Sequence, residues 1–172
     1  MRFPSVFIAL VTAAVVVLSG CHAPKFANGQ SAPDFSGVTL AGDTLQLSKL
    51  RGHIVLLDFW GSWCGPCRAA NPEVLHLYND YHDADFGNAR GLEVVSIAIE
   101  KAAGNAERAI ADDGLRWKTH IVEQNNFESP IAHLYEVRSI PTQYLIDENG
   151  MIIGVNLSYD ATNHILRNRV KH

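Results

Sequence analysis

The sequence contains no cluster of lysine and arginine residues, and this absence excludes one class of function. Its 14 basic residues are outnumbered by 18 acidic ones, which leaves a formal net charge of −4 over 172 residues. Proteins that bind nucleic acid need a basic surface to contact the phosphate groups. We therefore expect no nucleic acid among the partners of this chain.

The chain also lacks internal repeats and low-complexity tracts from residue 34 onward. Hydrophobic residues make up 47% of the sequence and charged residues 19%, a composition typical of globular rather than disordered proteins. A length of 172 residues suffices for one hydrophobic core but not comfortably for two. We therefore predict a single domain over residues 34–172 and expect it to be a monomer.

Cysteine is scarce, with only Cys21, Cys64 and Cys67 in the whole chain. Structural zinc sites take four ligands. Here no second Cys-x-x-Cys pair accompanies the first one, and the eight histidines are scattered. We therefore expect no metal site. Cys21 stands apart from the pair, and its position suggests a different role.

The longest hydrophobic run follows Arg2 at the start of the sequence and extends over residues 3–18. A basic start, an apolar middle and small residues at the exit are the pattern of a secretory signal. An uncleaved transmembrane helix is the alternative, because the run is nearly long enough to span a bilayer. Both interpretations place the rest of the chain outside the cytoplasm, because Arg2 stays on the inner side.

Residues 18–21, Leu-Ser-Gly-Cys, resemble the lipobox of bacterial lipoproteins. The resemblance implies cleavage before Cys21 and attachment of lipid to that residue. Residues 22–33 lack periodicity and contain Pro, Gly, Asn and Ser, which is typical of a tether. We therefore predict a signal peptide over 1–20 and a lipidated Cys21 with its tether over 21–33. The domain would be held on a membrane of the cell envelope and face the periplasm.

The domain alternates predicted strands and helices. A hairpin is expected over 35–47, buried strands over 53–59 and 92–99, another strand over 117–122, and a second hairpin over 143–155. Helices are expected from the Cys67 turn to about Tyr81, and over 104–113, 129–135 and 161–170. This order predicts an α/β fold in which helices cover both faces of a central mixed sheet.

The segment Trp63-Cys64-Gly65-Pro66-Cys67 follows a predicted buried strand and begins a helix. A disulfide is attacked by a thiolate, so the attacking sulfur needs a low pKa and access to solvent. A helix N-terminus favours the thiolate through free N–H groups and the positive end of the dipole. We expect Cys64 to be the exposed nucleophile and Cys67 the shielded resolving cysteine. An inert structural disulfide is the alternative, although so short a loop would add little stability.

Two stretches resemble the thioredoxin superfamily, and within it the membrane-tethered thiol–disulfide oxidoreductases related to TlpA and ResA. The first is residues 55–68, VLLDFWGSWCGPCR, and the second is residues 135–147, YEVRSIPTQYLID, with Gly150 just beyond. The similar layout extends from about Ser31 to the end. It implies a thioredoxin-like fold with an N-terminal β-hairpin extension. It also implies an inserted element between the Cys-x-x-Cys helix and the second motif.

Pro141 matches the cis-proline of that superfamily, and an X-Pro bond tolerates the cis form far better than other peptide bonds do. The resemblance implies that this loop faces Cys64. It also implies that the backbone of residue 140 pairs with an extended substrate, while Trp63 offers an apolar ledge. An ordinary loop proline is the alternative. The predicted substrate-binding residues are Trp63, Gly65, Pro66, Ile140, Pro141 and Thr142.

Asp58 aligns with the buried acid of thioredoxin, six residues before Cys64. A charged, unpaired acid in an apolar strand costs several kcal/mol, so we expect a raised pKa at Asp58. Such a group suits the role of accepting the proton of Cys67 during resolution. The alternative is an aspartate satisfied by local hydrogen bonds at the end of the strand.

Three positions test the resemblance further. Ala70 stands where members of this branch often carry an acid, whereas Pro72 matches their helix-kinking proline. Glu100 follows a predicted strand near a position where some cytochrome-maturation members have an active-site acid, with Lys101 as the competing match. We interpret Glu100 as a surface residue.

The resemblance implies an extracytoplasmic reductase of protein disulfides that needs no cofactor besides the redox-active pair Cys64–Cys67. Its electrons would come from an integral-membrane thiol transporter, and its role would be cytochrome c maturation or redox homeostasis of the envelope. A peroxidase is one alternative, although Leu57 and Gly61 occupy the Pro and Thr positions of the peroxiredoxin motif. A non-redox binding module is the other alternative, and the intact cysteine pair argues against it.

Overall fold

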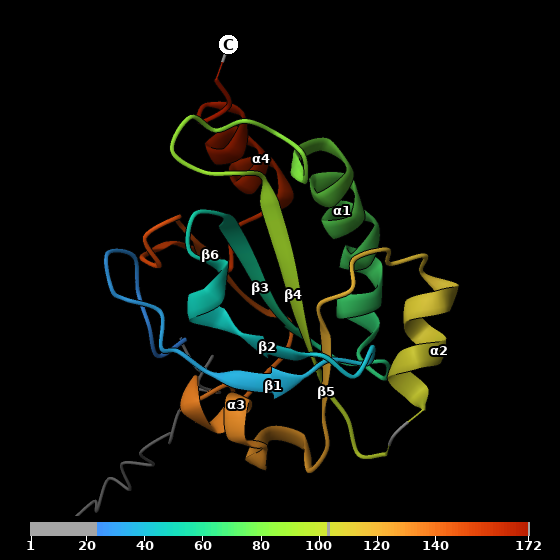
Figure 1. Ribbon diagram of the computed structural model, residues 1–172. Helices are drawn as coiled ribbons and strands as arrows, with labels where there is room; N and C mark the ends of the chain where they lie inside the picture. The colour runs from blue at the N-terminus through green and yellow to red at the C-terminus, as the bar shows by residue number, and fades with distance from the viewer. Residues whose placement is uncertain (1–23, 103, 172) are drawn as a thin grey trace, which may run out of the picture.

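A computed structural model describes residues 24–102 and 104–171 of the chain (Figure 1). The predicted signal peptide, Cys21 and the first part of the predicted tether lie outside these residues. Within the described part, no helix combines the length and the apolar character needed to cross a membrane.

Five strands form one mixed sheet in the order β5-β4-β3-β6-β7. Strand β3 lies at its centre, pairs in parallel with β4 and antiparallel with β6, and β5 and β7 form the edges. The bounds of the strands are Ile54–Trp60 for β3, Leu92–Ile99 for β4, His120–Glu123 for β5, Thr142–Ile146 for β6 and Ile152–Val155 for β7. The predicted α/β fold with a central mixed sheet is confirmed.

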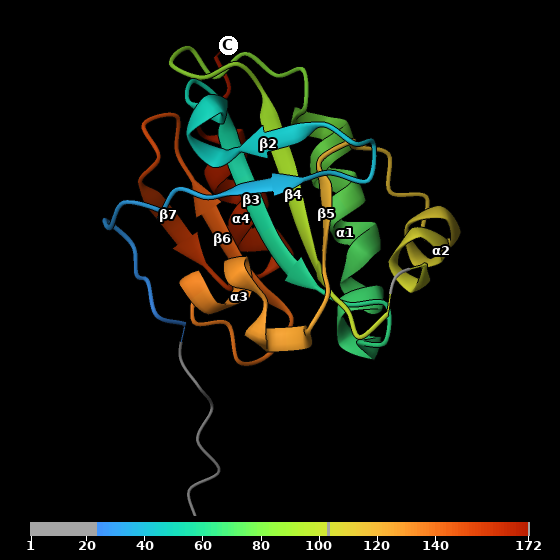
Figure 2. The same ribbon diagram turned by 60° about the horizontal axis from the view of Figure 1, so that its bottom comes forward.

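Helices and a small hairpin cover the two faces of this sheet. One face carries α1 (Gly65–Tyr81), α2 (Asn105–Asp112) and α4 (Tyr159–Arg167). The other carries α3 (Pro130–Leu134), a 3-10 turn (Leu47–Leu50) and the predicted hairpin of β1 (Ser36–Val38) and β2 (Thr44–Gln46). Figure 2 shows this hairpin and α3 in front of the sheet, with α1 and α4 behind it. Between β4 and β6 lie α2, β5 and α3, in the region where an inserted element was expected.

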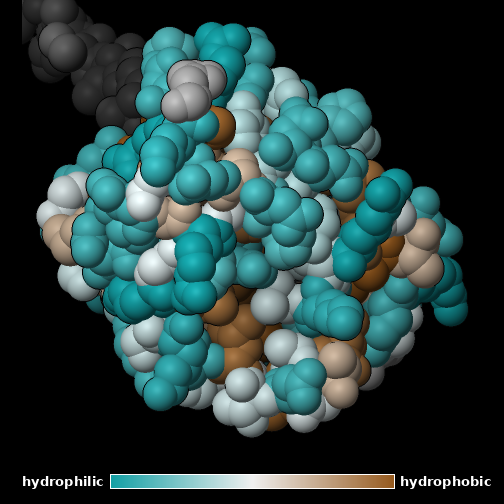
Figure 3. Space-filling model, turned by 45° about the horizontal axis from the view of Figure 1, so that its top comes forward, coloured by the Kyte–Doolittle hydropathy of each residue, from teal (hydrophilic) through white to brown (hydrophobic). Residues whose placement is uncertain are grey.

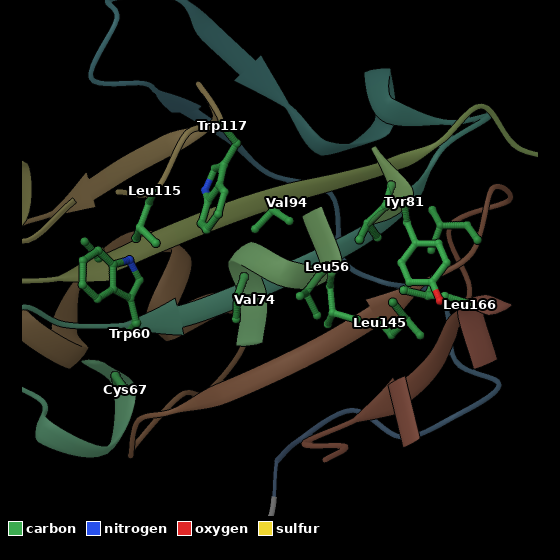
Figure 4. Packing of buried hydrophobic residues seen from close by; sticks show 14 of the residues in the cluster. Leu56, Trp60, Cys67, Val74, Tyr81, Val94, Leu115, Trp117, Leu145 and Leu166 are labelled. Atoms are coloured by element: carbon green, nitrogen blue, oxygen red, sulfur yellow. The ribbon is translucent and has the colours of Figure 1, made fainter. Parts of the chain in front are cut away.

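Alternation along β3 divides the interior into two cores. All seven residues of the strand are buried, as expected for a central strand covered on both sides. Ile54, Leu56 and Trp60 belong to the core under α1 and α4. The intervening apolar residues Val55, Leu57 and Phe59 belong to the core under α3. Figure 4 shows the first of these cores, including Leu56, Trp60 and Cys67.

The segment predicted as a free tether packs against the domain within the described residues, which corrects that expectation. Phe26 contacts Tyr135 edge-on, with ring centroids 5.6 Å apart. The backbone N–H of Gly29 donates to the carbonyl oxygen of Ile152 at 2.8 Å. Hydrophobic contact and pairing along the β7 edge therefore hold residues that composition alone marks as linker.

Two other predicted boundaries are wrong for identifiable reasons. Strand β5 begins at His120 rather than at Trp117, because the Trp117 side chain turns into the core and its indole N–H donates to Ser96 Oγ at 2.9 Å. The last helix begins at Tyr159, two residues earlier than predicted, because the Ser158 hydroxyl caps it.

Polar side chains dominate the molecular face in Figure 3, with hydrophobic residues visible only between them.

Candidate active site

Cys64 and Cys67 form a disulfide at the start of α1, with an S–S distance of 2.08 Å. Cys64 is the N-cap residue of the helix, and its sulfur accepts a hydrogen bond from the backbone N–H of Cys67 at 3.2 Å. After reduction this N–H and the positive end of the helix dipole would stabilise a thiolate at Cys64. The geometry therefore suits Cys64 as the nucleophile.

The exposure of the two sulfurs corrects one expectation. Cys67 is 1% exposed, as predicted for the shielded partner, but Cys64 is only 5% exposed rather than open to solvent. Cys64 belongs to the hydrophobic core under α1, against which Ile140 also packs. Gly65 and Pro66, between the cysteines, are exposed. A substrate would therefore approach over this exposed turn.

The loop that contains Pro141 faces the disulfide. The Ile140–Pro141 peptide bond is cis, and the carbonyl oxygen of Ile140 lies 3.8 Å from the Cys64 sulfur. Thr142 fixes the loop, since its hydroxyl donates to the carbonyl oxygen of Ser139 at 2.8 Å. The structure thus brings the two sequence motifs together, as the resemblance implied.

Trp63 lies beside this loop and is 53% exposed. Its indole N–H donates to the carbonyl oxygen of Ile99 at 2.8 Å, so the ring is held in place although its face is open. Phe127 meets it edge-on at a centroid distance of 6.4 Å. Both rings line a hollow of about 520 Å³. The apolar surface expected at Trp63 is therefore present, and Phe127 forms part of it as well.

Gly61 lets Trp63 and Ile140 lie close to the backbone just before the disulfide. A Cβ atom at this position would lie 2.9 Å from Trp63 Nε1 and 3.1 Å from Ile140 Cδ1. A larger residue would displace the tryptophan, the cis-proline loop or both. Glycine at this position therefore permits the contact between the two motifs.

Glu100 is buried and not a surface residue, which corrects the sequence interpretation. Its side chain is 1% exposed. One carboxylate oxygen accepts a hydrogen bond from the backbone N–H of Ser62 at 2.7 Å, and the other accepts from the Ser62 hydroxyl at 3.0 Å. The end of β4 thereby fixes the loop that leads into Cys64. Sequence reasoning missed Ser62, because a serine in a turn is normally solvated.

Asp58 lies on β3 between Leu56 and Trp60, so its side chain points to the face covered by α1. It is 3% exposed. Burial raises the pKa of Asp58 to about 6, while a hydrogen bond from Gln143 acts in the opposite direction. The expected rise in the pKa of Asp58 is thus present. Gln143, which the sequence analysis missed, donates its side-chain N–H to the carboxylate at 2.9 Å.

Arg68 follows the disulfide, and its charge is paired rather than free. Its guanidinium makes two hydrogen bonds to the carboxylate of Asp113, one of them 2.6 Å long, and the Asn71 amide donates to the same carboxylate at 2.6 Å. Burial favours a higher pKa at Asp113, but these hydrogen bonds hold it below its usual value. The cluster ties the C-terminal end of α2 to the first turns of α1.

Among residues 24–102 and 104–171, no group of three or more His, Cys, Asp or Glu side chains is arranged to hold a metal ion. Asp58 and Gln143 lie on the face of the sheet that also carries Cys67, and Glu100 and Ser62 fix the loop before Cys64. They are suited to proton transfer and to positioning of the loop.

A disulfide at a helix N-terminus, opposite a cis-proline in a thioredoxin-like fold, defines a class of thiol–disulfide oxidoreductases. The model of the AhpC/TSA family matches residues 28–155, and the chain belongs to that family. The predicted resemblance to the TlpA/ResA-like enzymes and the predicted enzyme class are both confirmed.

Three similar proteins illustrate this relationship. The thioredoxin-like protein YneN of Bacillus subtilis (strain 168) is 34% identical over 131 residues, which are 75% of this chain and 71% of that protein. The thiol-disulfide oxidoreductase ResA of Geobacillus kaustophilus (strain HTA426) is 32% identical over 141 residues, 80% of this chain and 75% of ResA. The thioredoxin domain of a thiol-disulfide oxidoreductase from Bacteroides vulgatus superposes with a TM-score of 0.71 at 25% identity, covering 82% of this chain and 99% of that domain.

Proposed function

We propose that this chain is a reductase of protein disulfides that acts outside the cytoplasm. The observation that carries the proposal is the Cys64–Cys67 disulfide at the N-terminus of α1, opposite the cis Ile140–Pro141 bond and on the same face of the sheet as buried Asp58. This arrangement provides a nucleophile, a resolving thiol, a substrate-facing loop and a proton acceptor. No group beyond the chain itself is needed for the exchange.

The reaction begins with the reduced pair. The Cys64 thiolate attacks one sulfur of the substrate disulfide, forms a mixed disulfide with it and releases the other substrate sulfur as a thiolate. Asp58 accepts the proton of Cys67, and the resulting thiolate attacks the Cys64 sulfur. The Cys64–Cys67 bond forms, the mixed disulfide breaks, and the second substrate sulfur leaves as a thiolate that takes up a proton. Two electrons have passed to the substrate.

The surroundings of Cys64 fit a protein substrate. The Ile140 carbonyl oxygen lies 3.8 Å from the Cys64 sulfur and can accept a hydrogen bond from an extended substrate backbone. Next to Cys64 in the chain, Trp63 and its neighbour Phe127 line a mainly apolar hollow. We assign substrate contact to Trp63, to the exposed Gly65-Pro66 turn and to the loop of residues 140–142.

Location and electron supply extend this proposal. The signal-like residues 1–20 and the lipobox-like sequence before Cys21 support export and lipid anchoring on a membrane of the cell envelope. A reductase in an oxidising compartment needs electrons from the cytoplasm. We therefore propose an integral-membrane thiol carrier as the donor. Substrates would be cysteine pairs of apocytochrome c or misoxidised envelope proteins.

A thiol peroxidase is disfavoured by one contact. The peroxiredoxin pattern needs a threonine three residues before the reactive cysteine, at the position of Gly61. A Cβ there would come within 2.9 Å of Trp63 Nε1, so a threonine would not fit without displacing the active-site tryptophan.

The reduction potential of the Cys64/Cys67 pair tests the proposed direction. The domain from residue 22 would be equilibrated in thiol–disulfide buffers, and its free thiols would be counted by mass-tagging. A potential at or below about −250 mV supports a reductase, because thioredoxin lies near about −270 mV. A potential near about −120 mV would reverse the direction, and the absence of reversible titration would leave only a structural disulfide.

A further inference from the structure

Gln143 contacts the proposed proton acceptor Asp58, yet the proposed mechanism gives it no role. It lies on β6, two residues after Pro141, and is the direct cross-strand neighbour of Asp58 on β3. Because side chains alternate along a strand, Gln143 points to the same face as Leu145, a member of the core under α1. Both side chains therefore lie on the face that also holds Cys67.

The contact between the two side chains is specific. The Gln143 side-chain N–H donates to Asp58 Oδ1 at 2.9 Å. Among the described residues, no other side chain is hydrogen-bonded to this carboxyl. A buried carboxylate with one side-chain donor depends strongly on that donor.

The backbone of Gln143 is fixed independently of Asp58. Its N–H donates to Asn156 Oδ1 at 2.7 Å, and its carbonyl oxygen accepts from the Asn156 backbone N–H at 2.9 Å. Asn156 adopts a positive φ of 46° to make this paired contact. The side chain of Gln143 therefore extends toward Asp58 from a backbone whose position is set on both sides.

A hollow of about 240 Å³ opens on the other side of Gln143, between α1 and the start of α4. Its walls include Ala70, Val74, Pro141, Asn156 and Tyr159. Ala70 has a small side chain, which leaves room in the hollow. The polar side chains of Gln143, Asn156 and Ser158 form part of its lining, so water can bind beside them. Gln143 thus stands between the buried acid and a space that water can occupy.

A primary amide suits this place because it can both donate and accept. When Asp58 is ionised, the amide N–H donates to the carboxylate. When Asp58 carries the proton, rotation of the amide presents its oxygen to the carboxyl O–H. An apolar side chain could neither donate a hydrogen bond to the ionised carboxylate nor accept one from the protonated carboxyl. The titratable side chains that line the hollow with Gln143 are those of Glu73 and Tyr159, and Cys67 lies in the core on the same face as Asp58.

We propose that Gln143 is a positioning residue for proton transfer, holding the Asp58 carboxyl by an amide hydrogen bond in both of its protonation states. The inference rests on the proposed function, in which Asp58 accepts the proton of Cys67. In this role Gln143 acts through Asp58, to which its amide is hydrogen-bonded. Loss of the Gln143 amide destabilises the ionised form of Asp58 more than its protonated form, because a hydrogen bond to a charged group is the stronger kind.

The test compares two matched glutamine-to-methionine variants in the full-length chain purified in detergent. Q143M keeps the side-chain length and removes the amide. Q46M is the control, because the Gln46 amide donates to the Asp34 carboxylate at 2.7 Å on the exposed surface. Q143N is a second variant that stays polar but is one methylene too short. Near-ultraviolet circular dichroism checks that each variant is folded.

Two readouts follow Asp58. Infrared difference spectra against Asp58→Asn report protonation of this carboxyl from pH 4 to pH 9, and single-turnover reduction of insulin reports the pH dependence of the reaction. In Q143M and Q143N we expect both midpoints to move upward by about one pH unit. Q46M should leave both midpoints at the wild-type pH. A merely structural role of Gln143 would lower stability without moving either midpoint.

Two results separate this inference from the proposed function. If the Asp58 midpoint stays in place in both Gln143 variants while Asp58→Asn removes the pH dependence, the role of Gln143 is wrong and the proposed mechanism stands. If Asp58→Asn leaves the pH dependence of reduction unchanged, the proposed proton acceptor is wrong. The infrared midpoint then still decides whether Gln143 holds the carboxyl.

Discussion

The two faces of the central sheet are equally buried but differ in chemistry. The face under α1 and α4 holds Asp58 and Gln143 among its apolar residues, together with the disulfide. The face under α3 holds a cluster of aromatic rings in which Phe59 contacts Tyr135 and Tyr144 at centroid distances of 5.4 Å and 6.3 Å. Adjacent residues of one strand, Asp58 and Phe59, therefore serve opposite purposes.

The difference shows what the fold requires of each face. A buried polar group is costly without a partner, and the α1 face supplies such partners through a helix terminus, an amide and a hollow. The α3 face has no chemistry to perform, so its packing can be almost wholly apolar. We expect substitutions of the reactive groups on the first face to change reactivity, and those in the aromatic cluster of the second face to change stability alone.

The largest effect on reactivity is expected at the sulfurs. Cys64→Ser removes the nucleophile and should abolish reduction of insulin. Cys67→Ser removes only the resolving thiol, so the Cys64 mixed disulfide should accumulate and be visible by non-reducing electrophoresis. Neither change removes much core volume, so both variants should remain folded. If the mixed disulfide accumulated in Cys64→Ser instead, Cys67 would be the nucleophile and Cys64 the resolving cysteine.

The largest effect on stability is expected on the opposite face. Phe59→Ala leaves a cavity among Tyr135 and Tyr144 and should lower the free energy of unfolding by about 3–5 kcal/mol. Denaturant titration of the oxidised protein measures this loss. The reduction potential of the remaining folded protein should stay at the wild-type value, since Phe59 faces away from the disulfide. A shifted potential would contradict the separation of the two faces.

An intermediate effect, with a distinctive pH dependence, is expected for Asp58→Asn. In the native state the pKa of Asp58 is raised by burial to about 6, so between about pH 4 and pH 6 the native state binds more protons than the unfolded state. The free energy of unfolding therefore falls as the pH rises through this window. At pH 7 the variant should be more stable than the wild type by up to about 3 kcal/mol.

The control for this prediction is the same pair of proteins at low pH. Below about pH 3, well under the usual aspartate pKa of about 3.9, the carboxyl is neutral in both states, so the two stability curves should converge. Denaturant titrations from about pH 3 to about pH 8 provide the comparison. Parallel curves over the whole range would mean that Asp58 is ionised to the same extent in the folded and unfolded protein.

Sequence patterns predicted the sheet and most helices because hydrophobic periodicity is local. They also identified Cys64, Cys67 and Pro141, because these residues stand in specific motifs. They missed Glu100 and Gln143, whose partners Ser62 and Asp58 are 38 and 85 residues away. A polar residue in a strand can face solvent or a buried partner, and only the strand register distinguishes these cases.

The packing of the N-terminal segment was missed for a related reason. Residues 24–33 have the composition of a linker, yet Phe26 and the backbone of Gly29 find partners on Tyr135 and Ile152. Pairing to a sheet edge needs no particular side-chain pattern, because backbone groups make the hydrogen bonds. Composition therefore overestimates the length of such a tether.

The smallest effect is expected for Ser158→Ala, which tests whether every position on the α1 face affects reactivity. Ser158 caps α4 through a hydrogen bond from the Ala161 N–H to its hydroxyl at 3.3 Å, and it lines the hollow beside Gln143. Ser158→Ala should lower the free energy of unfolding by about 1 kcal/mol. Because the capping hydroxyl does not touch Asp58, the pH dependence of insulin reduction should stay unchanged. A shifted profile would extend the reactive region from β3 and β6 to the start of α4.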